Sequence, residues 1–456
     1  MEQLKHPEEG INPLESLREN IEEGTRALES FREGMGDKTQ QLQESLGDRA
    51  ENAIGNMIEN SRLEAPELSL DSGCPETEVP QMEPCVWYRI PVEGGCTADG
   101  SEYHIYARRG NSEKLCVFFS GGGIAWNPYT AARPVTRGRV LAWQPNYYWS
   151  NLRPFTQIYN IGVGLTDNSR KNPFYDWNFV VITYATGDMH LGRNEYHFKD
   201  DQGQEQCIHF HGFENFCLSM QISRRLFPSA GKLLIAGESA GAFAVPALAE
   251  KVHQDYYPQC RDVTLLSDSA LLLNRNWKKT AREVWNVPEE ICRDIHGRNL
   301  TLDWYRALYK RHGSEWRYLY ANSVRDYLLS AFYNDVKNRR YDTDDRIQRI
   351  FQRQLRDMTS SLKEITPDFG IYLCDWKRPF LYRGGTVHTM VRQPEFYLHR
   401  RSRPSMAAWL AAAVEGDVRD EGLELTRKRT RKQRIEIREK RKKALKEAGR
   451  RAKHTV

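Results

Sequence analysis

Short, continuous apolar runs separated by polar, helix-like stretches dominate the middle of the chain. The clearest runs occupy residues 115–119, 179–184, 233–236, 263–266 and 369–373. Because each run is hydrophobic at successive rather than alternate positions, it is typical of a strand that is buried on both faces of a parallel sheet. The pattern therefore predicts an α/β fold, with a mostly parallel central sheet flanked by helices.

The two ends of the chain differ from this middle part. Residues 1–72 are polar, and an apolar residue recurs there every seventh position, at Leu14, Ile21, Leu28, Met35 and Leu42. Gly24 and Lys38 interrupt the second apolar position that a coiled coil needs. We expect a polar leader, helical or disordered, through which the protein could oligomerise, followed by one globular domain over residues 73–420.

Residues 421–456 form a basic tail, helical or disordered. From Arg427 to the end, 15 Lys and Arg residues stand against three Glu, a net charge of +12 in a chain whose total is +5. Such a tail attracts anionic surfaces such as RNA, the ribosome or lipid through their phosphates. It holds no aromatic residue for base stacking, which argues against specific nucleic-acid recognition. A purely solubilising tail is the alternative.

Membrane-spanning and secretory signals are not visible in the sequence. No stretch approaches the roughly 20 apolar residues that cross a bilayer, and the first residues lack an apolar core. The nine cysteines are an odd number without a C-x-x-C pair. We therefore expect a cytoplasmic protein with reduced thiols. A disulfide between Cys74 and Cys85, or between Cys85 and Cys96, is the alternative for an exported protein.

The run at 233–236 continues into Gly237-Glu238-Ser239-Ala240-Gly241, the pattern G-x-S-x-G. This pattern places a serine on a sharp strand-to-helix turn with its hydroxyl exposed above the sheet, so Ser239 is a candidate nucleophile. A glycine triplet, 121–123, follows the run at 115–119. Its backbone amides and that of Ala240 could hold a developing oxyanion.

A base and an orienting acid should follow the serine along the chain, the acid first. His388 lies in a loop after the last apolar run and is the candidate base. Two aspartates are candidates for the acid. Asp268 ends the apolar run after the nucleophile, and Asp345 lies where a helix is expected to start, a position at which aspartate is also a common cap.

Several segments carry a resemblance to a known family. They are Phe119–Gly123, Asn172–Asn178, Tyr184–Gly192, Gly237–Gly241, Asp345–Gln348, His388–Met390 and Trp409. In these segments, which span about residues 85–417, the chain resembles the pectin acetylesterase/Notum family, and its bacterial members more than its plant or animal ones. The resemblance implies an alpha/beta-hydrolase-like fold and a serine carboxylesterase that needs no metal or cofactor.

The same resemblance implies roles for individual residues. Ser239 would be the nucleophile, Asp345 the acid and His388 the base, with Asp268 as the alternative acid. The oxyanion hole would be formed by Gly122, Gly123 and Ala240. The expected reaction is hydrolysis of O-acyl esters, with acetyl or another short acyl group on a small molecule or glycan, through an acyl-enzyme.

The chain also departs from the eukaryotic members. They have Tyr-Cys where this chain has Tyr184-Ala185, and Gly-Gly where it has Gly241-Ala242. They are secreted and rich in disulfides, so the substrate stays open. Two alternative functions are a non-catalytic binding protein with a hydrolase-like body, and a lipid acyl hydrolase that its basic tail recruits to anionic membranes.

Other polar and aromatic residues are candidates for a substrate or metal site. Asp188 and His190 lie in a glycine-containing loop and are candidates for substrate contacts. Trp126 begins an aromatic stretch that either lines an acyl pocket or packs a long insertion. Four histidines cluster in sequence near Asp188 and Glu195, at positions 190, 197, 209 and 211. We expect them to serve in loops and at a pocket rim, with no metal bound.

Overall fold

A computed structural model describes most of the chain between residues 65 and 427. The described ranges are 65–70, 81–136, 139, 144–153, 160–377, 384–399 and 403–427. The expectations for residues 1–64 and for the tail beyond residue 427 lie outside these ranges. No helix within them has the length and apolar character needed to cross a membrane.

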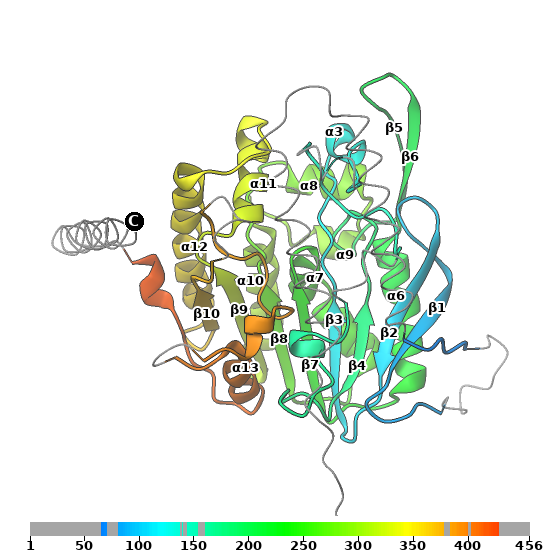
Figure 1. The fold of residues 1–456 in the computed structure, drawn as a ribbon, viewed down its shortest axis with the longest axis vertical. Helices are drawn as coiled ribbons and strands as arrows, with labels where there is room; N and C mark the ends of the chain where they lie inside the picture. The colour runs from blue at the N-terminus through cyan, green and yellow to red at the C-terminus, as the bar shows by residue number, and fades with distance from the viewer. Residues whose placement is uncertain are drawn as a thin grey trace, which may run out of the picture.

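An eight-stranded sheet forms the centre of the fold (Figure 1). Its strands lie in the order β1-β2-β4-β3-β7-β8-β9-β10. They are β1 (Trp87–Cys96), β2 (Glu102–Arg108), β3 (Lys114–Phe119), β4 (Asn178–Ile182), β7 (Lys232–Glu238), β8 (Val263–Asp268), β9 (Trp316–Ser323) and β10 (Gly370–Cys374). β1, β2 and β4 pair antiparallel, and every pair from β4 to β10 is parallel. The five apolar runs correspond to β3, β4, β7, β8 and β10, which confirms the predicted fold.

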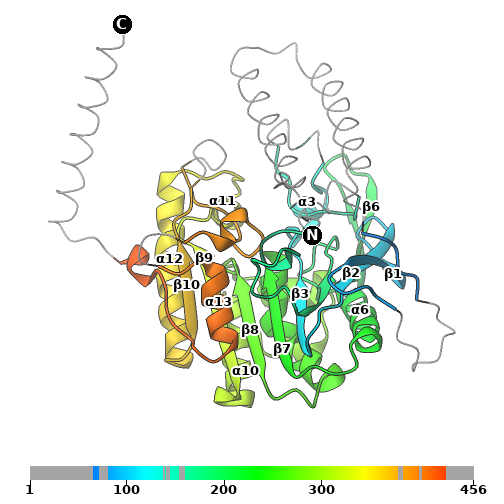
Figure 2. The same cartoon turned by 60° about the horizontal axis from the view of Figure 1, so that its bottom comes forward.

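Side chains of alternate residues along β3 enter two separate hydrophobic layers. Leu115, Val117 and Phe119 join one layer, and Cys116 and Phe118 join the other. The first layer is covered by α6 (Gly212–Leu226), α7 (Ala240–Lys251), α10 (Leu300–His312) and α12 (Asp345–Ile365). The second is covered by α13 (Met406–Val414), on the opposite face of the sheet (Figure 2). Burial on both faces explains why β3, β4 and β7 each hold a continuous apolar run.

Further elements connect or project from this framework. The short helices are α3 (Pro128–Ala131), α8 (Trp277–Lys279), α9 (Glu289–Cys292) and α11 (Tyr327–Asn338), the last of which begins just after β9. A two-stranded antiparallel hairpin, β5 (Asn194–Lys199) and β6 (Glu205–Phe210), projects at the edge of the molecule near β1 (Figure 1).

Both outer strands of the sheet are covered by short segments of the same chain. The amide of Leu68 donates to the carbonyl of Arg89 on β1, at 2.9 Å. At the other edge, the amide of Leu373 on β10 donates to the carbonyl of Glu421, at 2.8 Å. Leu68 and Leu423 also pack against the core. Described residues on both sides of the range 73–420 therefore pack against this domain.

Candidate active site

The turn after β7 holds Ser239 in an uncommon backbone conformation. Its φ of 50° and ψ of −122° lie where residues other than glycine are rarely found. A Cβ on Gly237 would lie 2.4 Å from the carbonyl oxygen of Gly241, and one on Gly241 would lie 2.1 Å from that of Phe119. Both glycines of the motif are thus required by close backbone approach, and the predicted strand–serine–helix turn is present.

Ser239, His388 and Asp326 form a chain of hydrogen bonds. The Nε2 atom of His388 lies 2.8 Å from the hydroxyl oxygen of Ser239. On the other side of the ring, Nδ1 lies 2.7 Å from Oδ2 of Asp326. The predicted pairing of Ser239 with His388 is therefore observed. The carboxylate at the far end of the chain comes from a residue that the sequence analysis did not select.

The start of α11 positions Asp326. Its Oδ1 atom accepts the amides of Leu328 and Leu329, at 3.0 and 2.9 Å, so the residue caps the helix. The side chain is fully buried. With Oδ1 occupied in this way, Oδ2 faces His388. The carboxylate thus lies at the positive end of the helix dipole.

The prediction that Asp345 orients His388 is wrong. Asp345 is the first residue of α12, and its exposed carboxylate pairs with Arg325 and Arg349. Asp326 was missed because β9, which mixes aromatic and polar residues, was not recognised as a strand. An aspartate just beyond that strand and before an apolar helix is the signal that would have identified it.

Asp268, the alternative acid, forms hydrogen bonds with the backbone of the loop that carries His388. It forms none with the imidazole ring of His388. Its carboxylate Oδ2 accepts the amides of Met390 and Val391, at 2.5 and 2.8 Å. Its main-chain carbonyl accepts the amide of Ser239 at 2.9 Å. Complete burial raises the pKa of the Asp268 carboxyl to about 6, although these hydrogen bonds act in the opposite direction.

The glycine triplet lies beside the serine turn, as the sequence analysis expected. A Cβ on Gly121 would lie 2.7 Å from the Cβ of Ser239, so Gly121 is in direct contact with the turn. Gly123 has a φ of 79° and faces the carbonyl of Tyr147. In the described part of the chain, the amides of Gly122, Gly123 and Ala240 donate no hydrogen bond, and neither does that of Gly121. The glycine loop therefore touches the serine turn through Gly121 and carries amides that no described acceptor takes.

Asp188 and His190 are buried and face the protein interior, which contradicts the expectation of substrate contacts. The Asp188 carboxylate accepts the amides of His190, Gly192 and Gly212 and the hydroxyl of Thr186. The His190 Nε2 lies 2.9 Å from the carbonyl oxygen of Ser120, just before the glycine triplet. Burial lowers the pKa of His190 to about 4, so the ring is neutral and Nε2–H is the donor.

Trp126 packs inside the domain. Its ring lies 5.3 Å from that of Tyr147 and 6.0 Å from that of Phe332, between ring centroids. Only 7% of Trp126 is exposed. Of the two roles considered for this aromatic stretch, packing of the insertion is the one that the geometry favours.

A buried ion pair lies directly behind the serine turn. Arg392 pairs with Glu238, the variable residue before Ser239 in the motif. Arg392 Nη1 also donates to Asn160 Oδ1 at 2.7 Å, and Asn160 Oδ1 accepts the hydroxyl of Ser120 at 2.9 Å. This network ties the loop of His388 to the serine turn and to the start of the glycine loop. In the sequence, the signal for this network is the arginine four residues after His388.

Among the residues that the structure describes, those that could hold a metal lie elsewhere, on the hairpin, at the residue that follows it and at the end of β1. The two overlapping sets are Cys96, His209 and His211, and Glu195, Cys207 and His209. Neither includes a member of the hydrogen-bond chain at Ser239. The eight described cysteines are all free thiols, so Cys85 and Cys96 form no disulfide with each other, and Cys74 lies outside the described residues.

Comparison with known proteins gives consistent results. The sequence profile of the pectinacetylesterase family matches residues 89–369, a range that includes Ser239 and Asp326. Pectin acetylesterase 4 of Arabidopsis thaliana is 27% identical over 184 residues, 38% of this chain and 39% of that protein. Pectin acetylesterase 5 of the same plant is 28% identical over 193 residues, 40% of each chain. The matched region thus spans about two fifths of the length of these relatives. Since the family profile covers well over half of the chain, the protein belongs to the pectinacetylesterase family.

Proposed function

We propose that the protein is a serine esterase that hydrolyses acetyl or other short O-acyl esters. The observation that carries this proposal is the continuous hydrogen-bond chain from Ser239 through His388 to Asp326, in a member of the pectinacetylesterase family. The three side chains have the order and the geometry of a nucleophile, a base and an orienting acid. Each contact lies within hydrogen-bond distance, and the one between Ser239 and His388 is close enough for proton transfer.

In the first step, the Ser239 hydroxyl attacks the ester carbonyl while Nε2 of His388 takes its proton. The carbonyl carbon becomes tetrahedral, and its oxygen becomes negatively charged. We assign the stabilisation of this oxyanion to the amides of Gly122, Gly123 and Ala240, with Gly121 beside them. Asp326 keeps the Nδ1 proton in place and stabilises the imidazolium that forms.

In the second step, the tetrahedral intermediate collapses and the alcohol leaves with the proton from His388. Ser239 then carries the acyl group. A water molecule attacks this acyl-enzyme as His388 takes its proton, and collapse of the second intermediate releases the carboxylic acid. The serine recovers its hydrogen from His388, so that one water is consumed for each ester bond broken.

The names of the two Arabidopsis relatives support a glycan as the substrate, since they denote acetyl esters of pectin. We accordingly propose an O-acetylated glycan or a fragment of one. We also propose a cytoplasmic location, because all the described cysteines are free thiols, which suits a reducing compartment. A cytoplasmic enzyme would meet soluble fragments and not an intact cell wall.

A fluorophosphonate probe tests the proposal, because it labels only a serine that a base activates. We expect wild-type protein to be labelled and Ser239→Ala to remain unlabelled and inactive on 4-nitrophenyl acetate. Ser223→Ala is the matched control, because Ser223 is a buried serine of α6 whose hydroxyl bonds to that of Tyr257 and not to the loops of Ser239 or His388. Hydrolysis by folded Ser239→Ala at the wild-type rate would overturn the assignment.

The length of the acyl group is tested separately with 4-nitrophenyl esters from acetyl to dodecanoyl. We expect kcat/KM to be greatest for acetyl and to decline as the acyl chain grows. A preference for long chains that appears only with anionic vesicles would instead support the lipid acyl hydrolase. Absence of labelling in folded wild-type protein would support the non-catalytic binding protein.

A further inference from the structure

The two faces of the hairpin β5–β6 carry side chains of different chemistry. Phe198, Ile208 and Phe210 are buried against the domain. The alternate residues face outward and form three cross-strand pairs, Glu195 opposite His209, His197 opposite Cys207, and Lys199 opposite Glu205. In the first two pairs all four residues carry an atom that can bind a transition metal, whereas the third is an ordinary exposed ion pair.

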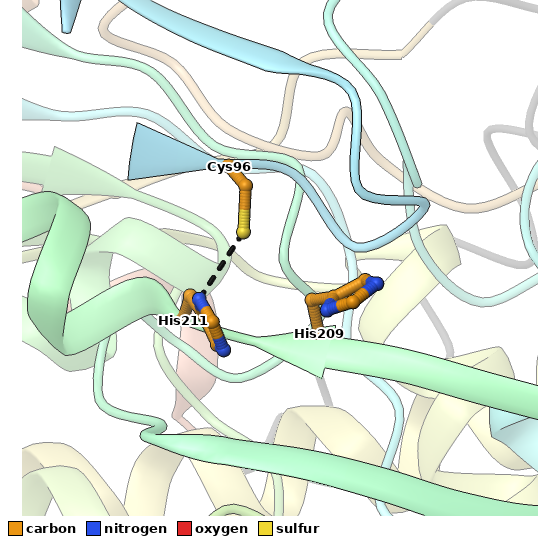
Figure 3. Close-up of side chains that lie close together, drawn as sticks. All are labelled: Cys96, His209 and His211. Atoms are coloured by element: carbon orange, nitrogen blue, oxygen red, sulfur yellow. Dashed lines mark hydrogen bonds between the residues drawn. The ribbon is translucent and has the colours of Figure 1, made fainter. Parts of the chain in front are cut away.

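Two further residues extend this face toward the body of the protein. His211 follows β6 by one residue and precedes α6, and Cys96 ends β1. The Cys96 sulfur lies 3.1 Å from Nδ1 of His211. Figure 3 shows Cys96 and His211 pointing toward each other, with His209 beside them. One ligand atom from each of the three residues lies within 4.8 Å of the other two.

The backbone around these residues is held firmly. The Asn215 side chain binds both sides of Cys96, accepting its amide at 3.1 Å and donating to its carbonyl at 2.7 Å. The amide of His209 donates to the carbonyl of Ala98, just after β1, at 3.1 Å. The three side chains are therefore brought together by β1, β6 and the start of α6, and not by one flexible loop.

Glu195 contacts both imidazoles. Its carboxylate lies 2.7 Å from Nδ1 of His209 and 2.9 Å from Nε2 of His211. Since Nδ1 of His211 faces the sulfur and Nε2 faces the carboxylate, the ring is oriented as a metal-ligating histidine usually is, with one nitrogen toward the metal and the other held by an acceptor.

We propose that Cys96, His209 and His211 bind one zinc ion, with Glu195 orienting the imidazoles and water or a Glu195 oxygen in the fourth position. Around tetrahedral zinc, with bonds of ~2.3 Å to sulfur and ~2.0 Å to nitrogen, neighbouring ligand atoms lie roughly 3.3–3.6 Å apart. The observed separations of 4.8 Å or less reach this geometry through small side-chain rotations. One thiolate with two imidazoles suits zinc, and it does not suit calcium or magnesium, which take oxygen ligands.

The overlapping set Glu195, Cys207 and His209 is less suitable. Glu195 and Cys207 are exposed, and all three residues belong to the hairpin itself. The proposed set is more enclosed and bridges the hairpin to the body of the protein, so that zinc would fasten the hairpin to β1. We therefore expect zinc to act mainly on the stability of the fold.

Cobalt(II) binding to the full-length, chelator-treated protein tests the proposal, because Co²⁺ occupies zinc sites and its bond to a thiolate produces an ultraviolet charge-transfer band. We expect this band at one Co²⁺ per chain, with loss of the band on addition of one equivalent of Zn²⁺. Zinc should also raise the melting temperature. Neither readout depends on esterase activity.

Variants separate the two sets of ligands. Cys96→Ser should abolish the charge-transfer band and the zinc-dependent shift in melting temperature, and His211→Gln should weaken both. Glu195→Gln should weaken zinc binding about 10- to 100-fold, as removal of an orienting partner does. Cys207→Ser is the matched control and should retain the band.

Three outcomes would overturn the inference. One is the absence of a charge-transfer band in folded wild-type protein, which would leave the cluster as a hydrogen-bonded network. Another is a band that persists in both Cys96→Ser and Cys207→Ser, which would place the metal on neither thiol. The third is a band lost in Cys207→Ser and retained in Cys96→Ser, which would move the metal to the outer face of the hairpin.

Discussion

The main-chain carbonyl of Asp268 accepts the amide hydrogen of Ser239 at 2.9 Å, and the carboxylate of the same residue holds the loop that carries His388. One residue at the end of β8 thus binds the turn of the proposed nucleophile and the loop of the proposed base. The distance between the side chains of Ser239 and His388 therefore depends on one residue, Asp268, which holds both of their segments.

Replacing this aspartate should impair catalysis without removing any group that reacts. In Asp268→Ala, the amides of Met390 and Val391 lose their acceptor and the His388 loop shifts. Since a displacement of about 1 Å can cost roughly 100-fold in rate, we expect kcat to fall about 10- to 100-fold. Steady-state kinetics and circular dichroism would be measured beside Asp262→Ala, at the far end of β8. Wild-type kcat in Asp268→Ala would contradict the positioning role.

Asp326→Asn separates the role of Asp326 in catalysis from its role in the fold. Asparagine is also a good N-cap, so α11 and the stability of the domain should be preserved. The new amide cannot hold the Nδ1 proton of His388 as the carboxylate does, and we expect kcat to fall about 1,000- to 10,000-fold. The exposed Asp345→Asn is the matched control and should keep wild-type kcat. The reverse result would restore Asp345 as the acid.

His190 should make the domain less stable in mild acid. Its pKa is lowered from 6.5 to about 4 by burial, so between these values the unfolded chain binds a proton that the folded protein does not. Stability from this residue is complete above pH 6.5 and declines as the pH falls to about 4, by on the order of 3 kcal/mol.

Urea unfolding at several pH values measures this effect against His190→Gln, whose amide can still donate to the Ser120 carbonyl. The difference in unfolding free energy between the two proteins should change across pH 6.5 to 4 and be constant above pH 7. A difference that does not depend on pH would show that His190 titrates equally in both states.

Removing one partner of the ion pair between Arg392 and Glu238 should lower the free energy of unfolding. Arg392→Met leaves the Glu238 carboxylate buried without its guanidinium, and we expect a loss of about 3–5 kcal/mol in unfolding free energy. Adding Glu238→Gln should recover part of this loss, because the uncompensated charge is gone. Thermal and urea unfolding of both variants would be compared. A double variant no more stable than Arg392→Met would assign the loss to the contact of Arg392 with the Phe118 ring, whose centroid lies 5.3 Å from the guanidinium carbon.

The strands and the serine turn could be predicted because their signals are local. β7 holds the continuous apolar run 233–236, β8 is apolar at Val263, Leu265 and Leu266, and the G-x-S-x-G pattern lies within five consecutive residues. The acid could not be chosen in this way. Asp326, Asp344 and Asp345 all lie at helix starts, and only the folded chain shows which carboxylate reaches a histidine 62 residues later in the sequence.

The burial of polar loops could not be predicted from the neighbouring residues in the sequence either. Asp188 and His190 lie in a glycine-containing segment that suggests an exposed loop. In the structure, amides from Gly192 and Gly212 satisfy the Asp188 carboxylate, and a carbonyl accepts the proton of His190. Such compensation depends on α6 packing against this segment, which no pattern within the loop reveals.

The short segments along β1 and β10 have a consequence for how the molecule meets other copies of itself. An uncovered outer strand offers a row of free amides and carbonyls, onto which another chain can add a strand. Here Leu68 occupies part of one such row and Glu421 part of the other. Trimming the chain to residues 73–420 would strip both rows at once. The shorter protein would keep every residue proposed for catalysis but would expose two unpaired strand edges. We therefore expect it to aggregate before it loses activity.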